Sequence, residues 1–203
     1  MKPEDEKTTI EKARQGDERA FEALVTQYER LVYAVALKLL GNEHDAQDAA
    51  QETFIKLYRS LSSFRGESKF SVWLYRLTNN VCIDMLRKKS VPAVSRDVDG
   101  DDGGALDVAD GRFSPENELE KKQLRQAVER ALASLPEPYR QALVLRETAG
   151  RSYEEIAQIL EIDIGTVKSR IYRARRRLCV ILSEDGNFFD GDPSKGPKGG
   201  AKA

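Results

Sequence analysis

Residues 91–115, VPAVSRDVDGDDGGALDVADGRFSP, interrupt the helical periodicity of the chain, and this interruption limits the fold more than any other feature. The stretch holds six acidic and two basic residues, is rich in Gly, and has no sustained apolar period, which is typical of a linker. A chain of 203 residues that is 40% hydrophobic can form two small cores. We therefore predict two small domains, residues 8–90 and 116–183, joined by a flexible acidic linker over 91–115. Residues 184–203, which end in GDPSKGPKGGAKA, are predicted to be a disordered tail.

Both flanking segments are predicted to be helical, because apolar residues recur every three or four positions and strand-like alternation is scarce. In the first segment an apolar stripe runs from Phe21 to Leu39, and Gly41 can end that helix in a left-handed C-cap conformation. The remaining helices are expected over residues 45–59, 71–89, 115–134 and from the Pro-containing break at 135–138 to about 148, followed by two shorter helices. The predicted fold class is all-α.

The chain has few side chains suited to metal binding or nucleophilic catalysis. Cys82 and Cys179 lie far apart and outside any CxxC motif, so we expect two reduced, buried thiols. His44 is the single histidine and is expected in a turn between helices, so a catalytic triad or a histidine-rich metal site is hard to assemble. We therefore expect no enzymatic activity, no metal and no cofactor.

The sequence also limits the compartment. Its longest apolar run, residues 31–37, is too short to span a bilayer, and the charged start MKPEDEK does not have the form of a signal peptide. We therefore predict a cytoplasmic protein without membrane insertion.

Positive charge is concentrated near the end of the second segment, although the formal net charge of the chain is -1. The stretch DIGTVKSRIYRARRRL, residues 163–178, holds six Lys or Arg against one Asp. Before it, Ser152 and Glu155 have the spacing of a capping box, which predicts the start of a short helix. Asp163 is a candidate N-cap for the next helix. A short capped helix, a turn and a second helix together predict a helix-turn-helix.

A helical wheel divides the last helix into a narrow apolar stripe and a broad polar face. Val167, Ile171, Ala174 and Leu178 fall within about 40° of one another and are predicted to be buried. The opposite face carries Lys168, Ser169, Tyr172, Arg173 and Arg176, and Arg170, Arg175 and Arg177 lie on its flanks. Such a pattern is also common in helices whose basic face is simply exposed to solvent and binds nothing. The preceding turn and the narrow stripe favour instead a recognition helix in the DNA major groove.

These motifs resemble a known family. The stretch LPEPYRQALVLRE followed by YEEIAQILEIDIGTVKSRIYRARRRL is similar to the fourth conserved region of bacterial sigma factors, and GDERAFEALVTQYERLVYAVALKLLG and DAQDAAQETFIKLYRSLSSFRGESKFSVWLYRLTNNVCIDMLRKK resemble their second region. Two such regions and little else are typical of the extracytoplasmic-function (ECF) group of the sigma-70 family. One departure is Glu161, because the turn of a helix-turn-helix often has Gly there.

The resemblance implies an alternative-type sigma factor that binds core RNA polymerase, directs it to promoters and helps to melt DNA. In this reading the recognition helix reads the minus-thirty-five element through Thr166, Lys168, Ser169, Arg170, Tyr172, Arg173 and Arg176. The minus-ten element is recognised and melted by Phe64, Arg65, Lys69, Arg76, Asn80, Arg87 and Lys88, with residues 62–69 forming a pocket for a flipped base. The linker would pass through the polymerase near its active site.

The helix predicted over residues 45–59 has two faces. A wheel places Ala46, Ala50, Thr53, Phe54 and Leu57 on its core side. An outward Ile among carboxylates is more often a tolerated surface residue than a binding contact. The resemblance changes that weighting and implies that Asp48, Gln51, Glu52 and Ile55 bind the beta-prime clamp helices of the polymerase. It also implies contact with the beta flap and inhibition by an anti-sigma factor until a stress response begins.

Two alternatives remain open from the residues. The aromatic residues near the flipped-base pocket also fit a bundle core, and Trp73 is expected to be mainly buried. The whole chain also fits a dimeric helix-turn-helix regulator whose first domain senses a ligand or partner, which would need a self-complementary patch and paired half-sites.

Overall fold

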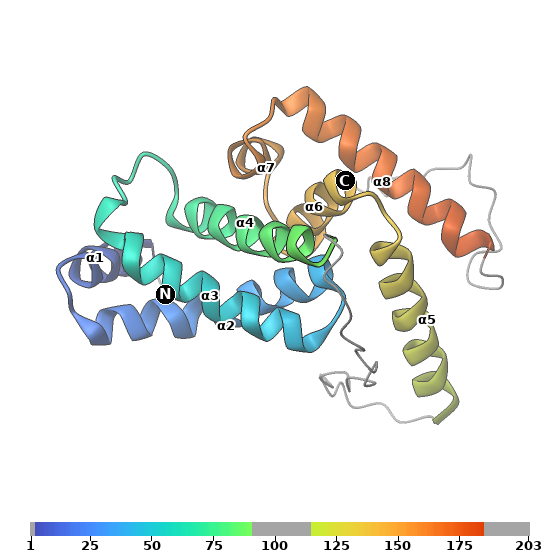
Figure 1. The fold of residues 1–203 in the computed structure, drawn as a ribbon, viewed down its shortest axis with the longest axis horizontal. Helices are drawn as coiled ribbons and strands as arrows, with labels where there is room; N and C mark the ends of the chain where they lie inside the picture. The colour runs from blue at the N-terminus through green and yellow to red at the C-terminus, as the bar shows by residue number, and fades with distance from the viewer. Residues whose placement is uncertain (1–2, 91–114, 185–203) are drawn as a thin grey trace, which may run out of the picture.

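The computed structural model describes residues 3–90 and 115–184. The predicted linker, apart from Pro115, and the predicted tail, apart from Glu184, lie outside the described residues. Within the two described ranges the chain forms eight α-helices and one short 3-10 turn, which confirms the all-α class (Figure 1). The elements are α1 (Pro3–Arg14), α2 (Glu18–Leu40), α3 (Glu43–Ser60), η1 (Leu61–Ser63), α4 (Phe70–Ser90), α5 (Pro115–Ala133), α6 (Glu137–Glu147), α7 (Tyr153–Leu160) and α8 (Ile164–Glu184).

Local capping sets the boundaries of the first helices. The side chain of Asp17 accepts a hydrogen bond from the backbone N–H of Ala20, 3.1 Å away, at the start of α2. At the other end Gly41 takes a left-handed conformation with φ 79°, as predicted, and donates to the carbonyl of Leu37. Asn42 then caps α3 through the N–H of Asp45. The two helices are thereby joined by a turn of minimal length.

The first unit is a bundle in which α2 packs against α1, α3 and α4. Its core includes the fully buried side chains of Leu24, Val32, Leu57 and Leu74. α1 was not predicted from the sequence. The Tyr28 hydroxyl on α2 donates to the Glu6 carboxylate on α1, and burial, followed by this hydrogen bond, raises the pKa of that phenol.

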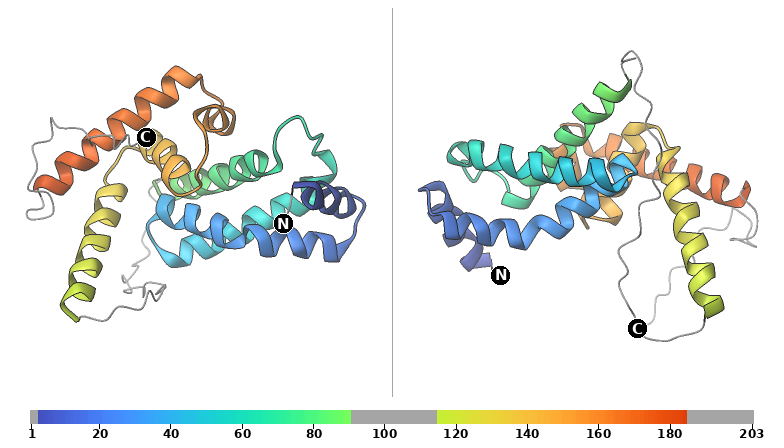
Figure 2. Two further views of the ribbon diagram at one scale, coloured as in Figure 1. Left: turned by 180° about the vertical axis from the view of Figure 1, so that it is seen from behind. Right: turned by 60° about the horizontal axis from the view of Figure 1, so that its bottom comes forward.

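The second unit comprises α5 to α8. α8 contacts α5, α6 and α7, while the beginning of α5 extends away from the other helices (Figures 1 and 2). With 21 residues, α8 is longer than α6, which has 11, whereas the sequence analysis expected it to be the shorter of the two. It carries the predicted apolar stripe, then continues to Leu182, which is buried against Ala127 and Ala131 of α5.

The two units lie against each other in this structure. α4 contacts α7, and α2 contacts α5 and α6. One continuous apolar cluster includes Val72 and Tyr75 from α4 together with Leu145, Ile156 and Ile159 from the second unit. The second unit therefore packs against the first in this conformation.

Two smaller expectations need correction. Cys82 is buried, and its pKa is raised to about 12 by burial, but Cys179 is only half-buried because it lies beside the apolar stripe of α8 and not within it. His44 was expected in a turn, yet it belongs to the first turn of α3 because Asn42 caps that helix earlier than predicted. Both cysteines are free thiols, as expected.

Candidate nucleic-acid interface

The start of α8 is fixed by Asp163. Its carboxylate accepts a hydrogen bond from the backbone N–H of Thr166 at 2.8 Å and another from the Thr166 hydroxyl at 2.5 Å. These two hydrogen bonds hold the pKa of the Asp163 carboxyl below its usual range. The predicted N-cap role of Asp163 is therefore supported by its geometry, and Asp163 satisfies a backbone N–H in the first turn of α8.

The buried and exposed faces of α8 match the helical wheel. Val167, Ile171 and Ala174 are buried, and Leu178 is half-buried at the end of the stripe. The candidate minus-thirty-five residues lie on the other faces: Lys168, Ser169, Tyr172, Arg173 and Arg176 are exposed, while Thr166 and Arg170 are half-buried. Tyr172 keeps 65% of its surface exposed, which a core residue would not. The face therefore has the accessibility that a groove-binding surface needs.

Tyr139 on α6 is a part of this surface that the sequence analysis missed. The Arg173 guanidinium donates to its hydroxyl at 3.5 Å, and the Arg177 guanidinium lies 5.3 Å from the centroid of its ring. The hydrogen bond from Arg173, followed by the positive charge of Arg173, Arg177 and Arg170, lowers the pKa of the phenol. No sequence period relates α6 to α8, so only the tertiary structure places Tyr139 between these arginines.

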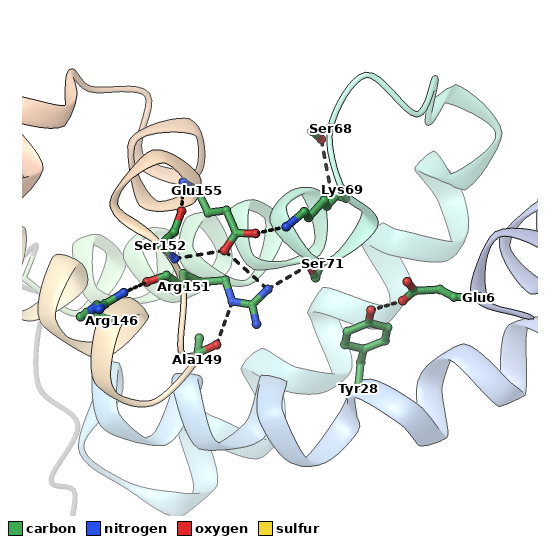
Figure 3. Close-up of polar contacts among 10 residues, drawn as sticks. All are labelled: Glu6, Tyr28, Ser68, Lys69, Ser71, Arg146, Ala149, Arg151, Ser152 and Glu155. Carbon is green, nitrogen blue, oxygen red and sulfur yellow. Dashed lines mark hydrogen bonds and ion pairs between the residues drawn. The ribbon is translucent and has the colours of Figure 1, made fainter. Parts of the chain in front are cut away.

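The start of α7 has the predicted capping box. The Ser152 hydroxyl accepts from the Glu155 backbone N–H at 3.2 Å, and the Glu155 carboxylate accepts from the Ser152 N–H at 3.1 Å (Figure 3). Glu161, the residue that departs from the family pattern, ends α7 in the left-handed region with φ 55°. Glu161 therefore adopts the backbone conformation that Gly adopts without strain. A residue with a side chain is strained in this conformation.

We predict that Ser152→Ala lowers the free energy of unfolding by about 1 kcal/mol, because the backbone N–H of Glu155 loses the hydroxyl that accepts its hydrogen bond. Urea denaturation followed by circular dichroism measures the change. Ser152→Thr, which keeps a capping hydroxyl, is the control and should cost less. Equal losses in the two variants would contradict the capping role.

The candidate minus-ten residues form two groups. Phe64, Arg65 and Arg76 line one groove together with Trp73. Phe64 is half-buried, with its ring centroid 5.0 Å from that of Trp73, and Trp73 is itself half-buried, so the expectation that Trp73 is mainly buried is only partly met. Lys69 is exposed at the end of the loop, next to this group. The other candidates, Asn80, Arg87 and Lys88, are exposed further along α4 and do not line the groove.

The candidate polymerase-binding residues share the outer face of α3. Asp48, Gln51, Glu52 and Ile55 are all exposed, with Ile55 at 37%. The carboxylates of Asp48 and Glu52 lie 3.9 Å from His44 and 3.8 Å from Lys56 of the same helix. On the core side, Ala46, Thr53 and Leu57 are buried as predicted, while Ala50 and Phe54 are half-buried. The outer face is therefore a small apolar spot with an acidic rim.

Comparisons with known proteins decide the family. The model of Sigma-70 region 2 matches residues 24–91, and the model of Sigma-70 region 4 matches residues 125–178. The ECF RNA polymerase sigma-E factor of Escherichia coli (strain K12) is 42% identical over 83% of this chain and 90% of that protein. The chain belongs to the ECF sigma factors. The RNA polymerase sigma-H factor of Pseudomonas aeruginosa is 36% identical over 88% of this chain and 94% of that protein.

Solved structures agree with this assignment. CnrH, solved in complex with the cytosolic domain of CnrY, superposes with a TM-score of 0.65 at 25% identity, covering 88% of this sigma factor and 97% of that chain. The sigma factor RpoE from Bartonella quintana, solved with the anti-sigma factor NepR, gives a TM-score of 0.60 at 28% identity, with coverage of 82% and 98%.

Family membership settles the choice between the two functions left open by the sequence. This chain is an alternative sigma factor, which directs RNA polymerase, and the dimeric regulator is not favoured. Sigma factors are transcription initiation factors. Among the described helices, none combines the length and the apolar character that crossing a bilayer requires.

Proposed function

We propose that this sigma factor divides promoter recognition between its two units, with the exposed cationic face of α8 reading the minus-thirty-five element. The observation that carries this proposal is the pairing of a buried stripe, Val167, Ile171 and Ala174, with an opposite face of exposed cations. A forked guanidinium such as that of Arg173 can bond both acceptors of a guanine edge, and the flanking cations neutralise phosphates.

The first unit recognises and melts the minus-ten element. Cations and aromatic rings alternate where α4 begins, and such a surface can hold unstacked bases on ring faces while its charges follow the backbone. Phe64, Arg65, Lys69 and Arg76 are the proposed contacts near the groove, and Asn80, Arg87 and Lys88 extend the basic track along α4. Extruding a base costs a few kcal/mol of stacking, which contacts in the pocket must offset.

The outer face of α3 binds core RNA polymerase through Asp48, Gln51, Glu52 and Ile55, on the beta-prime clamp helices, and the second unit contacts the beta flap. The polymerase, not the sigma factor, catalyses RNA synthesis in the cytoplasm. The solved relatives CnrH and RpoE were each captured with a protein partner, in the second case a named anti-sigma factor. We propose that this chain has an anti-sigma factor as well.

Copurification tests the proposal. Purified chain and core RNA polymerase should elute together from a gel-filtration column, and the free chain should bind duplex promoter DNA weakly. Elution as a dimer that binds a palindromic site tightly without polymerase would contradict it.

Tyr139 is a proposed positioning residue for Arg173. Tyr139→Phe removes the hydroxyl but keeps the ring beneath Arg177, so we expect promoter affinity in the holoenzyme to fall about twofold to tenfold, the range of one net hydrogen bond. The loss should be confined to the base pair that Arg173 contacts, as measured by competition with single-base variants of the promoter. A uniform loss on every sequence, or a lower melting temperature, would indicate a purely structural role.

A further inference from the structure

Two cations of the proposed minus-ten surface are occupied by carboxylates of the helix-turn-helix. The Lys69 ammonium lies 2.8 Å from the Glu155 carboxylate, and the Arg76 guanidinium lies 3.3 Å from the Glu161 carboxylate (Figure 3 shows the first pair). Glu155 and Glu161 stand at the two ends of α7, so this one short helix reaches two of the cations proposed to hold single-stranded DNA.

Arg151 makes a third contact across the same boundary. It precedes α7, donates to the Ser71 hydroxyl at 3.1 Å, and lies 5.4 Å from the centroid of the Tyr75 ring on α4 (Figure 3 labels Arg151 and Ser71). Its guanidinium also donates to the Ala149 carbonyl at 2.8 Å. Arg151 therefore bridges the loop before α7 and the first two turns of α4.

Apolar burial accompanies these polar contacts. Val72 and Tyr75 on α4 belong to the same buried cluster as Ile156 and Ile159 on α7. On the other side of the boundary, Lys38 of α2 lies 2.8 Å from Glu129 of α5. Exposed ion pairs alone would contribute little, but here they surround apolar surface that is removed from water.

We propose that α7 acts as an internal competitor of single-stranded DNA, with Glu155 and Glu161 taking the places of two backbone phosphates on Lys69 and Arg76. The free sigma factor is then closed, and it must release α7 before the minus-ten strand can be captured. This inference rests on the proposed role of Lys69 and Arg76 and adds a form of regulation to that same site.

The geometry of a promoter requires the release. Phe64 of the minus-ten surface and Ile164 at the start of the recognition helix line one groove. The two promoter elements, by the positions that name them, are centred about 25 base pairs apart, or on the order of 80 Å along duplex DNA. The chain between Ser90 and Pro115 can span a distance of the same order when extended. The closed arrangement cannot engage the two promoter elements at the same time. The chain between Ser90 and Pro115 is long enough to permit an open arrangement, in which the two units are apart.

The first test detects the closed contact in the intact free protein. A carbodiimide joins an amine directly to a carboxylate in contact with it, so it should link Lys69 to Glu155, and mass spectrometry of tryptic peptides identifies the product. We expect the link in the free chain and a clear decrease when core polymerase or excess single-stranded DNA is added. Absence of the link in the free chain, or an unchanged yield in the holoenzyme, would overturn the proposal.

The second test removes the charges of α7 without removing its cap. Glu155→Gln combined with Glu161→Gln keeps the capping box, because Gln also serves at that position. Binding of a fluorescent, mixed-sequence single strand of about 20 nucleotides is then measured by anisotropy. If about nine in ten free molecules are closed, the apparent affinity should rise up to about tenfold.

The matched control is Glu22→Gln combined with Glu184→Gln, which removes the same charge from exposed positions that do not line the groove. Its affinity should stay near that of the wild type. Equal gains in both double variants would show a general charge effect and overturn the proposal, as would no gain in either. Transcription by the wild type with core polymerase is measured in parallel. If the wild type fails to support transcription, the proposed function is refuted. If the wild type transcribes normally but the two double variants have equal affinity for the single strand, only the internal competition is refuted.

Discussion

Arg173→Ala is expected to remove most transcription from the cognate promoter while leaving polymerase binding intact. Arg173 is exposed on the outer face of α8, so its truncation should leave the buried stripe of the helix undisturbed. One Arg-to-guanine contact is worth about 1 to 3 kcal/mol of discrimination, which corresponds to about a 5- to 150-fold loss. In vitro transcription with a saturating amount of variant measures the first effect, and titration of core polymerase measures the second.

Arg175→Ala is the matched control, since it removes the same charge from the flank of the same helix. Arg175 is held 2.6 Å from Glu147 and lies on a flank of α8, about 160° around the helix from Arg173. We expect a much smaller loss of transcription for this variant. That loss should change with salt concentration more than with promoter sequence. If the Arg173 variant lost polymerase binding and transcription equally, the proposed division of roles between the two units would be wrong.

Ile55→Asp should weaken binding to core RNA polymerase at least about tenfold, the effect expected when a charge is placed at the apolar centre of an interface. Ile55 is the apolar residue of the α3 face and lies near the carboxylates of Asp48 and Glu52. Because 37% of its surface is already exposed in the free protein, the melting temperature should change little. Fluorescence titration of the labelled chain with core polymerase gives the affinity.

The control for this variant is Leu31→Asp, the same chemical change at an apolar residue of α2 that is 40% exposed. Polymerase affinity should be retained. Equal losses from the two substitutions would show that the outer face of α3 is not the docking surface. If Ile55→Asp lowered the melting temperature strongly and Leu31→Asp did not, Ile55 would instead have a structural role in the stability of the bundle.

Features determined by neighbouring residues were predictable from the sequence. The buried stripe of α8, the capping box of Ser152 with Glu155, and the left-handed Gly41 each depend on side chains within one or two helical turns. Glu161 illustrates the limit of such patterns, since it departs from the usual Gly yet takes the same left-handed conformation. Here the packing of α7 and α8 determines the turn, at the cost of local strain.

Features that join distant parts of the chain could not be predicted. Tyr139 reaches Arg173 from another helix, and Arg151 reaches Tyr75 from another unit. Periodicity reports which side of a helix is buried, but not which helix covers it. α1 was not predicted because Ile10 and Ala13 are its only apolar residues, too few to form a period, and its contact with α2 includes the hydrogen bond from Tyr28 to Glu6. The roles assigned to the individual site residues stay predictions until variants are measured.

In vitro transcription with purified chain, core RNA polymerase and fragments of the source genome tests the central claim most directly. The account predicts initiation that depends on this chain, at start sites preceded by two shared elements whose spacing fits two separate recognition units. Initiation that is the same without the chain, or chain-dependent initiation at sites sharing no upstream element, would contradict it.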